Sequence, residues 1–577
     1  MKKIAIVIAV LVLVISGIVY ADVFASRIKI SNPNGSPFDG KFTDGTGMKV
    51  SYILNDTAAS VELKVYNAST NAVTASVVSS SQGRGPNSIT WDGTGAVLGQ
   101  KYYVKLQATQ KPHSADTYFA YYFQQTADVP PTPIARGIYT RGLDVNNNMD
   151  TRGFGYWYAS CSDPGNNDGY RTGTLRYNPD GSFAGSDTGH PILMQTLGTA
   201  NGGTFDWGGT APWTTAVDSK GRIYQVSNGG SFITRMDNDS AVPKIIIRNI
   251  TSPRGLYTLG EGANLKLYIA ADTVVWRANI GTSDTLTTAL ELVGSFGAYV
   301  RDVILDDDGF MFVSLRTGAS GTTPGYVERY DITGTLPKKR VDAAFSIVHS
   351  TGLPVCFALK HGPDKNSASD DTMYYSIRGL NGSDTLNLGI HQITDIDGAF
   401  PEAKRIFKSG DVPGSIGGNN NTNADIALDW AGNIVWFENA NEEIFMIAPP
   451  RAGTVVTRIT KGYDTVTVQN ASSVSKDGLP VEFSLNQNYP NPFNPSTLIS
   501  YTLPVHAAVT VIVYDILGNI VSELFNGEAQ QGYNAIMWNA SNVSGLKAAS
   551  GVYLYRVTAR LSDGRSFSDT KRMVLLK

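Results

Sequence analysis

Short runs of alternating apolar and polar residues dominate the first part of the chain. In Val50–Leu54 and Ala59–Tyr66 about every second residue is apolar, which is the pattern of strands with one buried face. Ser88–Gly93 and Tyr102–Ala108 continue this pattern, and turn residues separate the runs at the spacing of a small β-sandwich. We therefore predict an Ig-like β-sandwich over residues 26–126.

The C-terminal residues 487–577 repeat this layout. Four runs match those of the first module in order: Leu498–Leu503, Ala508–Asp515, Ala535–Asn539 and Gly551–Val557. Trp91 and Trp538 occupy equivalent places, which predicts a core aromatic residue between two sheets in each module. Both copies resemble the Ig-like domain of the flagellar hook-capping family, most closely in Val513–Gly518 and Ser550–Tyr555.

A second repeat fills residues 134–469, between the two modules. Its unit is one or two apolar residues, a polar turn and an aromatic-rich strand, as in Ala216–Tyr224, Ile304–Val313 and Ala427–Trp436. An Asx or type I turn with Gly reverses each hairpin. Because a single blade cannot bury both its faces, we expect the six copies to close into a ring. The sequence thus predicts an all-β protein with a central six-bladed β-propeller between two sandwiches.

The edges of this middle region leave one alternative open. Residues 454–469 have a strand-like pattern, so they indicate either a seventh blade or a closing strand for the first blade. We predict a Pro-rich linker at residues 127–133, before the propeller, and a second linker at residues 470–486, after it. The middle region resembles NHL-type and gluconolactonase-like propellers at the level of the repeat.

The acidic cluster Asp306–Asp308 is a candidate calcium site, because clustered carboxylates are hard oxygen ligands. It lacks the twelve-residue spacing and terminal Glu of an EF-hand, and it lies where other units have a plain turn. Asp144, Asp218 and Asp429 take the same place in their units. This repetition favours turns over metal ligands.

No catalytic pattern appears in the sequence. The six histidines show neither an HExxH motif nor a close pair, and no G-x-S-x-G motif occurs. We therefore predict no catalytic, cofactor-binding or metal-binding residues. The resemblance to gluconolactonase-like enzymes implies an alternative, a propeller hydrolase or lactonase with a metal held over the channel by carboxylates and amides. Glu261, Asn146 and Asn423 are its candidate ligands, although no pattern selects them.

Charge and loop composition bear on possible partners. The net charge of −3 excludes a basic footprint for nucleic acid. The polar loops Asp163–Gly169 and Gly417–Asn423, with Trp207, Trp213 and Tyr156–Tyr158, form a candidate face for a glycan or peptide, but packing between blades is the favoured role of these aromatics.

The two cysteines, Cys161 and Cys356, lie far apart in the sequence. We expect two separate thiols rather than a disulfide.

The first 21 residues have the pattern of a secretory signal. Lys2 and Lys3 precede the apolar run Ile4–Val19, and small or branched residues end the segment. We predict cleavage between Ala21 and Asp22. The run is short for a membrane span, so export is favoured over a retained anchor.

A proline-rich motif precedes the C-terminal module: Tyr489, Pro490, Asn491, Pro492, Phe493, Asn494 and Pro495. Its prolines fix φ and remove backbone donors, so we predict an extended boundary segment that separates cargo from a terminal module. With the finish Lys571–Lys577, this region resembles the type IX secretion sorting domain. That resemblance implies transport by the type IX machinery to the surface or surroundings of a Gram-negative bacterium.

These observations together predict a secreted or cell-surface binding or structural protein. The propeller is the expected platform for a glycan or protein ligand. A self-assembling surface-layer or filament subunit is a further alternative.

Overall fold

The computed structural model describes the following residues: 22–35, 40–43, 46–111, 119–123, 140–161, 172–185, 192–199, 203–208, 212–281, 289–306, 308–317, 325–349, 352–360, 371–379, 389–394, 396, 402–408, 425–438, 443–450, 456–469, 483–488, 491–530, 532–542, 546–561 and 565–576. Within these ranges the regular elements are β-strands and short 3-10 turns. None of the helices found there is long and apolar enough to cross a membrane.

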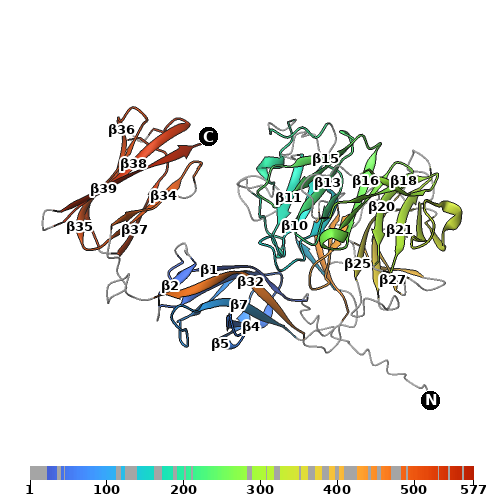
Figure 1. The fold of residues 1–577 in the computed structure, drawn as a ribbon, viewed down its shortest axis with the longest axis horizontal. Coiled ribbons are helices and arrows are strands. Elements are labelled where there is room, and N and C mark those ends of the chain that lie inside the picture. Colours follow the sequence, from blue (N-terminus) through green and yellow to red (C-terminus); the bar gives the residue numbers. More distant parts are fainter. Residues whose placement is uncertain are drawn as a thin grey trace, which may run out of the picture. The chain divides into compact units, whose positions relative to one another are not determined.

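Six sheets among the described residues form a propeller (Figure 1). In hydrogen-bonded order, the first blade is β9 (Thr140–Val145), β10 (Trp157–Cys161) and β11 (Gly173–Tyr177), and the second is β12 (Thr215–Val217), β13 (Ile223–Ser227), β14 (Phe232–Met236) and β15 (Lys244–Arg248). The third blade is β16 (Pro253–Leu259), β17 (Lys266–Ala271), β18 (Val274–Asn279) and β19 (Glu291–Ser295), extended by β23 (Lys338–Lys339), and the fourth is β20 (Tyr299–Leu305), β21 (Phe310–Arg316), β22 (Gly325–Asp331) and β24 (Phe345–His349). The fifth blade is β25 (Gly352–Lys360), β26 (Thr372–Gly379), β27 (Gly389–Thr394) and β28 (Ala403–Phe407), and the sixth is β29 (Asp425–Leu428), β30 (Ile434–Glu438), β31 (Glu443–Ala448) and β8 (Phe119–Phe123). The inner strands β9, β12, β16, β20, β25 and β29 contact one another in this order, and β29 contacts β9. The ring is therefore closed.

The last blade takes its outer strand, β8, from the segment that precedes the first blade in the sequence. Strand β8 pairs antiparallel with β31, with Phe123 opposite Ile444 and Phe119 opposite Ala448. The predicted sandwich boundary at residue 126 placed this strand in the first module. The pairing moves it to the propeller, where it joins both ends of the ring in one sheet.

The first sandwich is completed by a strand that follows the propeller. One sheet holds β1 (Ala25–Ser31), β3 (Met48–Leu54) and β6 (Gly85–Trp91), and the other has the order β2 (Lys41–Thr43), β32 (Thr457–Gln469), β7 (Lys101–Gln110), β4 (Ala58–Asn67) and β5 (Val73–Gln82). The Gln110 N–H donates to the Val456 carbonyl at 2.9 Å. Residues 454–469 had been expected to supply a blade or to close one, and this was wrong. The propeller is an insertion between β7 and β32.

The C-terminal module has the same strand order without an insertion. Its sheets are β33 (Ser484–Leu485), β34 (Thr497–Leu503) and β37 (Gly532–Trp538), and β36 (Ile520–Ala529), β35 (Ala507–Tyr514), β38 (Gly551–Arg560) and β39 (Ser566–Leu575). Strand β33 lies inside the predicted linker 470–486, so the module begins earlier than expected.

The two core tryptophans confirm the predicted equivalence of the sandwiches. Trp91 and Trp538 are both buried. Each donates its indole N–H to a carbonyl three residues further on, of Thr94 at 3.2 Å and of Ser541 at 3.0 Å.

The proline-rich motif is part of the C-terminal module. The ring of Phe493 is buried 5.6 Å from that of Trp538, and its N–H donates to the Val574 carbonyl at 2.9 Å. The Asn491 carboxamide oxygen accepts the Val574 N–H at 2.9 Å. The segment therefore binds the last strand, rather than acting only as a boundary. Tyr489 and Pro490 lie outside the described residues.

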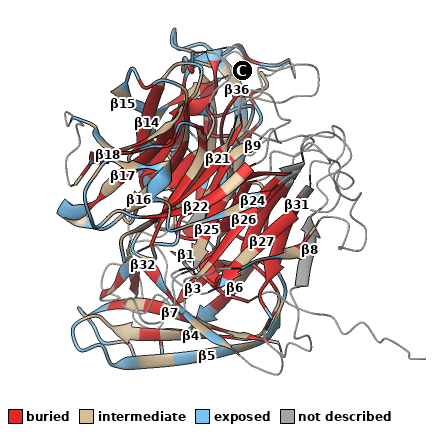
Figure 2. Cartoon of the chain, turned by 90° about the vertical axis from the view of Figure 1, so that its right-hand side faces the viewer, coloured by how far each residue is buried: buried red, intermediate tan, exposed pale blue. Residues whose placement is uncertain are grey.

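Contacts divide the chain into two units. One holds most of the first sandwich together with the propeller, and the other holds the C-terminal module with residues 41–47 and 96–100. Figure 2 shows the propeller strands as mostly buried, whereas β5, at the edge of its sheet, is largely exposed or intermediate. Separate apolar clusters thus fill the spaces between neighbouring blades.

Candidate ligand site in the propeller channel

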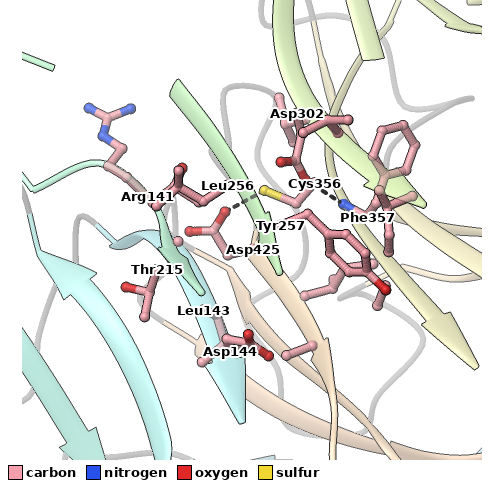
Figure 3. Close-up of a pocket in the computed structure, with 18 of the residues that line it drawn as sticks. Arg141, Leu143, Asp144, Thr215, Leu256, Tyr257, Asp302, Cys356, Phe357 and Asp425 are labelled. Atoms are coloured by element: carbon pink, nitrogen blue, oxygen red, sulfur yellow. Dashed lines mark hydrogen bonds between the residues drawn. The ribbon is translucent and has the colours of Figure 1, made fainter. Parts of the chain in front are cut away.

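The inner strands surround a cavity of about 160 Å³ at the centre of the ring. Side chains from all six blades line it, because each blade presents its first strand to the axis. Figure 3 shows the cavity, with Arg141 and Asp144 pointing to different parts of it although both lie on β9. This channel is the natural candidate for a ligand site.

One end of the channel is cationic. The guanidinium carbons of Arg141, Arg254 and Arg301 lie 4.5, 4.7 and 5.6 Å from the centre of the Trp213 ring. All four residues lie at or next to the start of an inner strand, so they share one face of the propeller. Burial, followed by the charges of Arg316 and Arg141, lowers the pKa of Arg254 below its ordinary value.

A thiol and two carboxyl groups lie further along the channel. The Cys356 Sγ–H donates to Asp425 Oδ1, and Asp302 Oδ2 accepts the Phe357 N–H at 3.0 Å (Figure 3). Burial raises the pKa of Asp425 to about 7 and that of Asp302 to about 8, and the charge of Asp425 adds to the shift at Asp302. The second oxygen of Asp425 is buried without a hydrogen-bond partner.

The cysteine is not an activated nucleophile. Burial and the neighbouring Asp425 and Asp302 raise the pKa of the Cys356 thiol well above its ordinary value. A thiolate is the reactive form, and it is favoured beside cations rather than carboxylates. In this arrangement Cys356 is a hydrogen-bond donor. Cys356 and Cys161 are separate thiols and form no disulfide, as predicted.

Asp144 differs from its predicted role. It lies in β9, where its Oδ2 accepts the Val217 N–H of the next blade at 2.7 Å, and burial raises its pKa to about 7. The turn position of this unit belongs to Asn146, whose side-chain oxygen accepts the Asn148 N–H at 3.1 Å. The assignment of Asp144 to the turn was therefore two residues early. Asp144 and Asp302 instead join neighbouring blades through backbone N–H groups.

The other repeated aspartates do form turns, as predicted. Asp218 Oδ1 accepts the N–H groups of Lys220 and Arg222 at 2.8 and 3.0 Å. Asp306 Oδ1 accepts those of Asp308 and Phe310 at 3.1 and 2.8 Å, and Asp429 Oδ1 those of Ala431 and Asn433, both at 2.9 Å. Each carboxylate thus satisfies the backbone of its own hairpin.

The metal candidates are not brought together at the channel. Glu261 precedes the 3-10 turn Gly262–Asn264 at a blade surface, Asn146 caps its turn, and Asn423 lies outside the described residues. Over the part of the chain that the structure describes, no group of three or more His, Cys, Asp or Glu side chains is arranged to hold a metal.

The proposed aromatic face has a mixed outcome. Trp157 and Trp207 are buried between strands and loops, whereas Trp213 is partly exposed at the channel mouth. The polar loops 163–169 and 417–423 lie outside the described residues.

Sequence reasoning missed the arginines around Trp213. A signal was available, because Arg141, Trp213 and Arg301 each stand five residues before the turn residues Asn146, Asp218 and Asp306. Arg254, in β16, does not follow that spacing, because Leu259 stands five residues after it. Equivalent positions in a ring meet at the axis, so the repeat spacing would have predicted the cluster.

Comparisons with known proteins agree with this architecture. A family profile described as FlgD Ig-like domain matches residues 494–563, within the C-terminal module. No curated protein matches the chain. Solved structures with similar folds include virginiamycin B lyase from Staphylococcus aureus (13% identity, 57% of this chain and 99% of that chain, TM-score 0.33) and RRP9 WD40 repeats (10%, 59% and 100%, 0.32). A third is the Trichoderma reesei Carbohydrate-Active Enzymes Family AA12 protein (12%, 59% and 97%, 0.36). The ring of six sheets makes the chain a β-propeller protein, and the profile match identifies its Ig-like C-terminal domain.

Proposed function

We propose that this chain is an exported binding protein whose propeller holds a small anionic ligand at the cationic end of its channel. The arrangement of Arg141, Arg254 and Arg301 around Trp213 carries the proposal. Three guanidinium groups within one small site repel one another, and an anion relieves that repulsion. The indole fixes the guanidinium planes through cation–π contacts, so less conformational freedom is lost when a ligand binds.

The chemistry of the site favours a carboxylate or sulfate group. Arginine presents paired N–H donors that match these oxyanions, and such charge-assisted hydrogen bonds are strong. Asp425 takes up part of the positive charge, because Arg141 and Arg301 both favour its ionised form. The cavity of about 160 Å³ suits a small acid, such as a sugar acid or the acidic end of a glycan, rather than an internal segment of a polymer.

The ligand site lies toward the face away from the first sandwich. The arginines lie where the inner strands start, whereas the sandwich contacts the turn that follows β29, where the Asn433 carboxamide binds Asp22. All inner strands run in the same direction around the ring, so these are opposite ends of the channel.

Calorimetric titration with glucuronate, malonate and sulfate, and with glucose as a neutral control, tests the binding proposal. We expect an anion to bind and Arg254→Ala to weaken its affinity about tenfold or more, the loss of one charge-assisted contact. Arg556→Ala is the matched control. The Arg556 guanidinium carbon also lies over an aromatic ring, 5.5 Å from the centre of the Tyr514 ring, but Arg556 belongs to the C-terminal module. Equal affinity in wild type and Arg254→Ala would contradict the site.

Export is the second part of the proposal. Its support is the signal-like segment Met1–Ala21 and the resemblance of the motif Tyr489–Pro495 and the finish Lys571–Lys577 to a type IX sorting domain. The proposed partner is the type IX machinery, and the proposed location is the cell surface or medium of a Gram-negative bacterium. Deleting residues 482–577 should retain the protein inside the cell envelope. An unchanged extracellular amount would overturn the sorting role.

A further inference from the structure

The first four described residues are buried. The exposed fractions of Asp22 and Val23 are 1%, and those of Phe24 and Ala25 are 0%. Residues at the beginning of a mature chain normally lie at the surface and are poorly ordered unless something holds them. Here the segment lies between the propeller and the first sandwich, and both contribute contacts.

The main chain of Asp22 is held by two carboxamides. Its N–H donates to Asn433 Oδ1 at 3.0 Å, and its carbonyl accepts Asn433 Nδ2 at 3.0 Å and Asn55 Nδ2 at 2.8 Å. Asn433 belongs to the turn after β29 and Asn55 follows β3, so one residue joins the propeller to the sandwich. The Asp22 carboxylate accepts Arg458 Nη2, from β32, at 2.9 Å.

Aromatic packing holds Phe24, two residues after Asp22. The ring of Phe24 lies 5.8 Å from those of Phe154 and Trp430, and Ala431 completes this cluster. The Phe24 N–H donates to Asn55 Oδ1 at 2.8 Å. Contacts of Asp22 itself and of Phe24, two residues later, therefore fix the position of Asp22.

Two carboxyl groups and one guanidinium lie close to the main chain of Asp22. Asp429 accepts Asn433 Nδ2 at 2.7 Å and Asn55 Nδ2 at 3.5 Å, so its carboxyl group shares both amides with Asp22. Burial raises the pKa of Asp429 to about 7; the charge of Asp22 adds to this shift, and that of Arg458 opposes it. A further cation beside Asp429 would therefore stabilise its ionised form.

We infer that this site binds the α-ammonium group that appears at Asp22 when the Ala21–Asp22 bond is hydrolysed. Hydrolysis consumes one water, leaves a carboxylate on Ala21, and converts the amide nitrogen of Asp22 into an ammonium with three N–H donors and one positive charge. That charge favours the ionised form of Asp429, which shares the Asn433 carboxamide with the main chain of Asp22, and one of the three donors keeps the bond to Asn433 Oδ1. Removal of the signal segment thereby locks the propeller onto the first sandwich. The inference rests only on the export part of the proposed function.

Chains with defined N-termini test this site directly. The full-length mature chain that starts at Asp22 is compared with one that keeps Tyr20 and Ala21, each released from a cleavable fusion partner. We expect the extended chain to unfold several degrees lower, since its ammonium group lies on Tyr20, two residues before the site. Asp429→Asn removes one carboxylate and should reduce the difference in unfolding temperature between the two chains. Asp515→Asn, the same change in an equivalent turn of the C-terminal module, should leave this difference in unfolding temperature unchanged.

The reactivity of the amino group shows directly whether the folded chain buries it. In the mature chain the Asp22 α-amino group should be acylated at least tenfold more slowly when folded than when unfolded. Equal reactivity, or equal unfolding midpoints of the mature and extended chains, would overturn the ammonium site. Sequencing the N-terminus of the exported protein separates the two proposals. A first residue other than Asp22 overturns the site even where export succeeds.

Discussion

The two sandwiches of this chain have one strand order but different connectivity. In the C-terminal module β38 ends at Arg560 and β39 begins at Ser566, so a short hairpin completes the sheet. In the first sandwich β7 ends at Gln110 and the equivalent β32 begins at Thr457, after the whole propeller. The comparison shows that a sandwich sheet tolerates a domain-sized insertion at a hairpin, because the two strands are neighbours in the sheet with and without it.

The insertion changes what each sandwich depends on. The C-terminal module is built from local pairings, and its core cluster contains only its own residues. The first sandwich acquires its last strand from across the propeller, and Phe24 packs on Phe154 and Trp430 of the ring. We therefore expect the first sandwich and the propeller to unfold together, and the C-terminal module to unfold by itself.

The matched core tryptophans give the largest expected effect. Trp91→Ala and Trp538→Ala should each cost about 3–5 kcal/mol of unfolding free energy, because both create a cavity under a sheet. Trp91→Ala should lower the transition of the sandwich and propeller, whereas Trp538→Ala should lower only that of the C-terminal module. Urea unfolding followed by limited proteolysis distinguishes the two. If Trp91→Ala left the propeller transition unchanged, the sandwich and propeller would be independent.

The sequence predicted the parts of this fold that depend on local pattern. Period-two runs identified β3, β4, β6 and β7 and their counterparts, and the repeat count predicted the six sheets of the ring. The exchange of β8 and β32 between domains was not predictable in this way. Strand partners are selected by three-dimensional proximity of edges, and an alternating run such as residues 457–469 fits any open edge equally well.

Phe493 distinguishes a docked motif from a free boundary segment. Phe493→Ala should cost about 3 kcal/mol in the C-terminal module, because the ring is buried against Trp538. Asn494→Ala, the neighbouring exposed position, serves as the control and should have little effect. Thermal unfolding of the module measures both. A neutral Phe493→Ala would return the motif to the role of a linker.

The turn aspartates Asp218 and Asp515 allow one type of hairpin to be compared in a buried and in a more exposed setting. Asp218 and Asp515 both cap their turns, but Asp218 also accepts Arg222 Nε at 2.6 Å and the Tyr224 hydroxyl at 2.9 Å. Asp218→Ala leaves a buried guanidinium without its partner, which should cost about 3 kcal/mol. Asp515 is only half-buried, so Asp515→Ala should cost far less. Chemical denaturation of both variants tests the ranking, and equal losses would show that the turn alone matters.

The channel site was less predictable than the fold. Trp213 appeared among the candidate aromatics, but Arg141, Arg254 and Arg301 are single cations far apart in the sequence. Ring closure brings them together. Likewise Asp302, Cys356 and Asp425 come from three different blades, and only the contact between inner strands turns them into a cluster with raised pKa values.

The channel carboxyls should also make the two units respond differently to pH. Asp302, with its pKa raised to about 8, binds a proton in the folded state at pH values where the unfolded chain has released it. Its contribution to stability is therefore largest at low pH and declines as the pH rises from about 4 to about 8. Asp302→Asn keeps an acceptor for the Phe357 N–H and removes the titration, so the difference in unfolding free energy between wild type and variant should change by about 1–3 kcal/mol across this range. Asp515→Asn should leave the propeller transition unaltered at every pH. Parallel profiles of wild type and Asp302→Asn between pH 4 and 8 would mean that water in the channel keeps this carboxyl ionised.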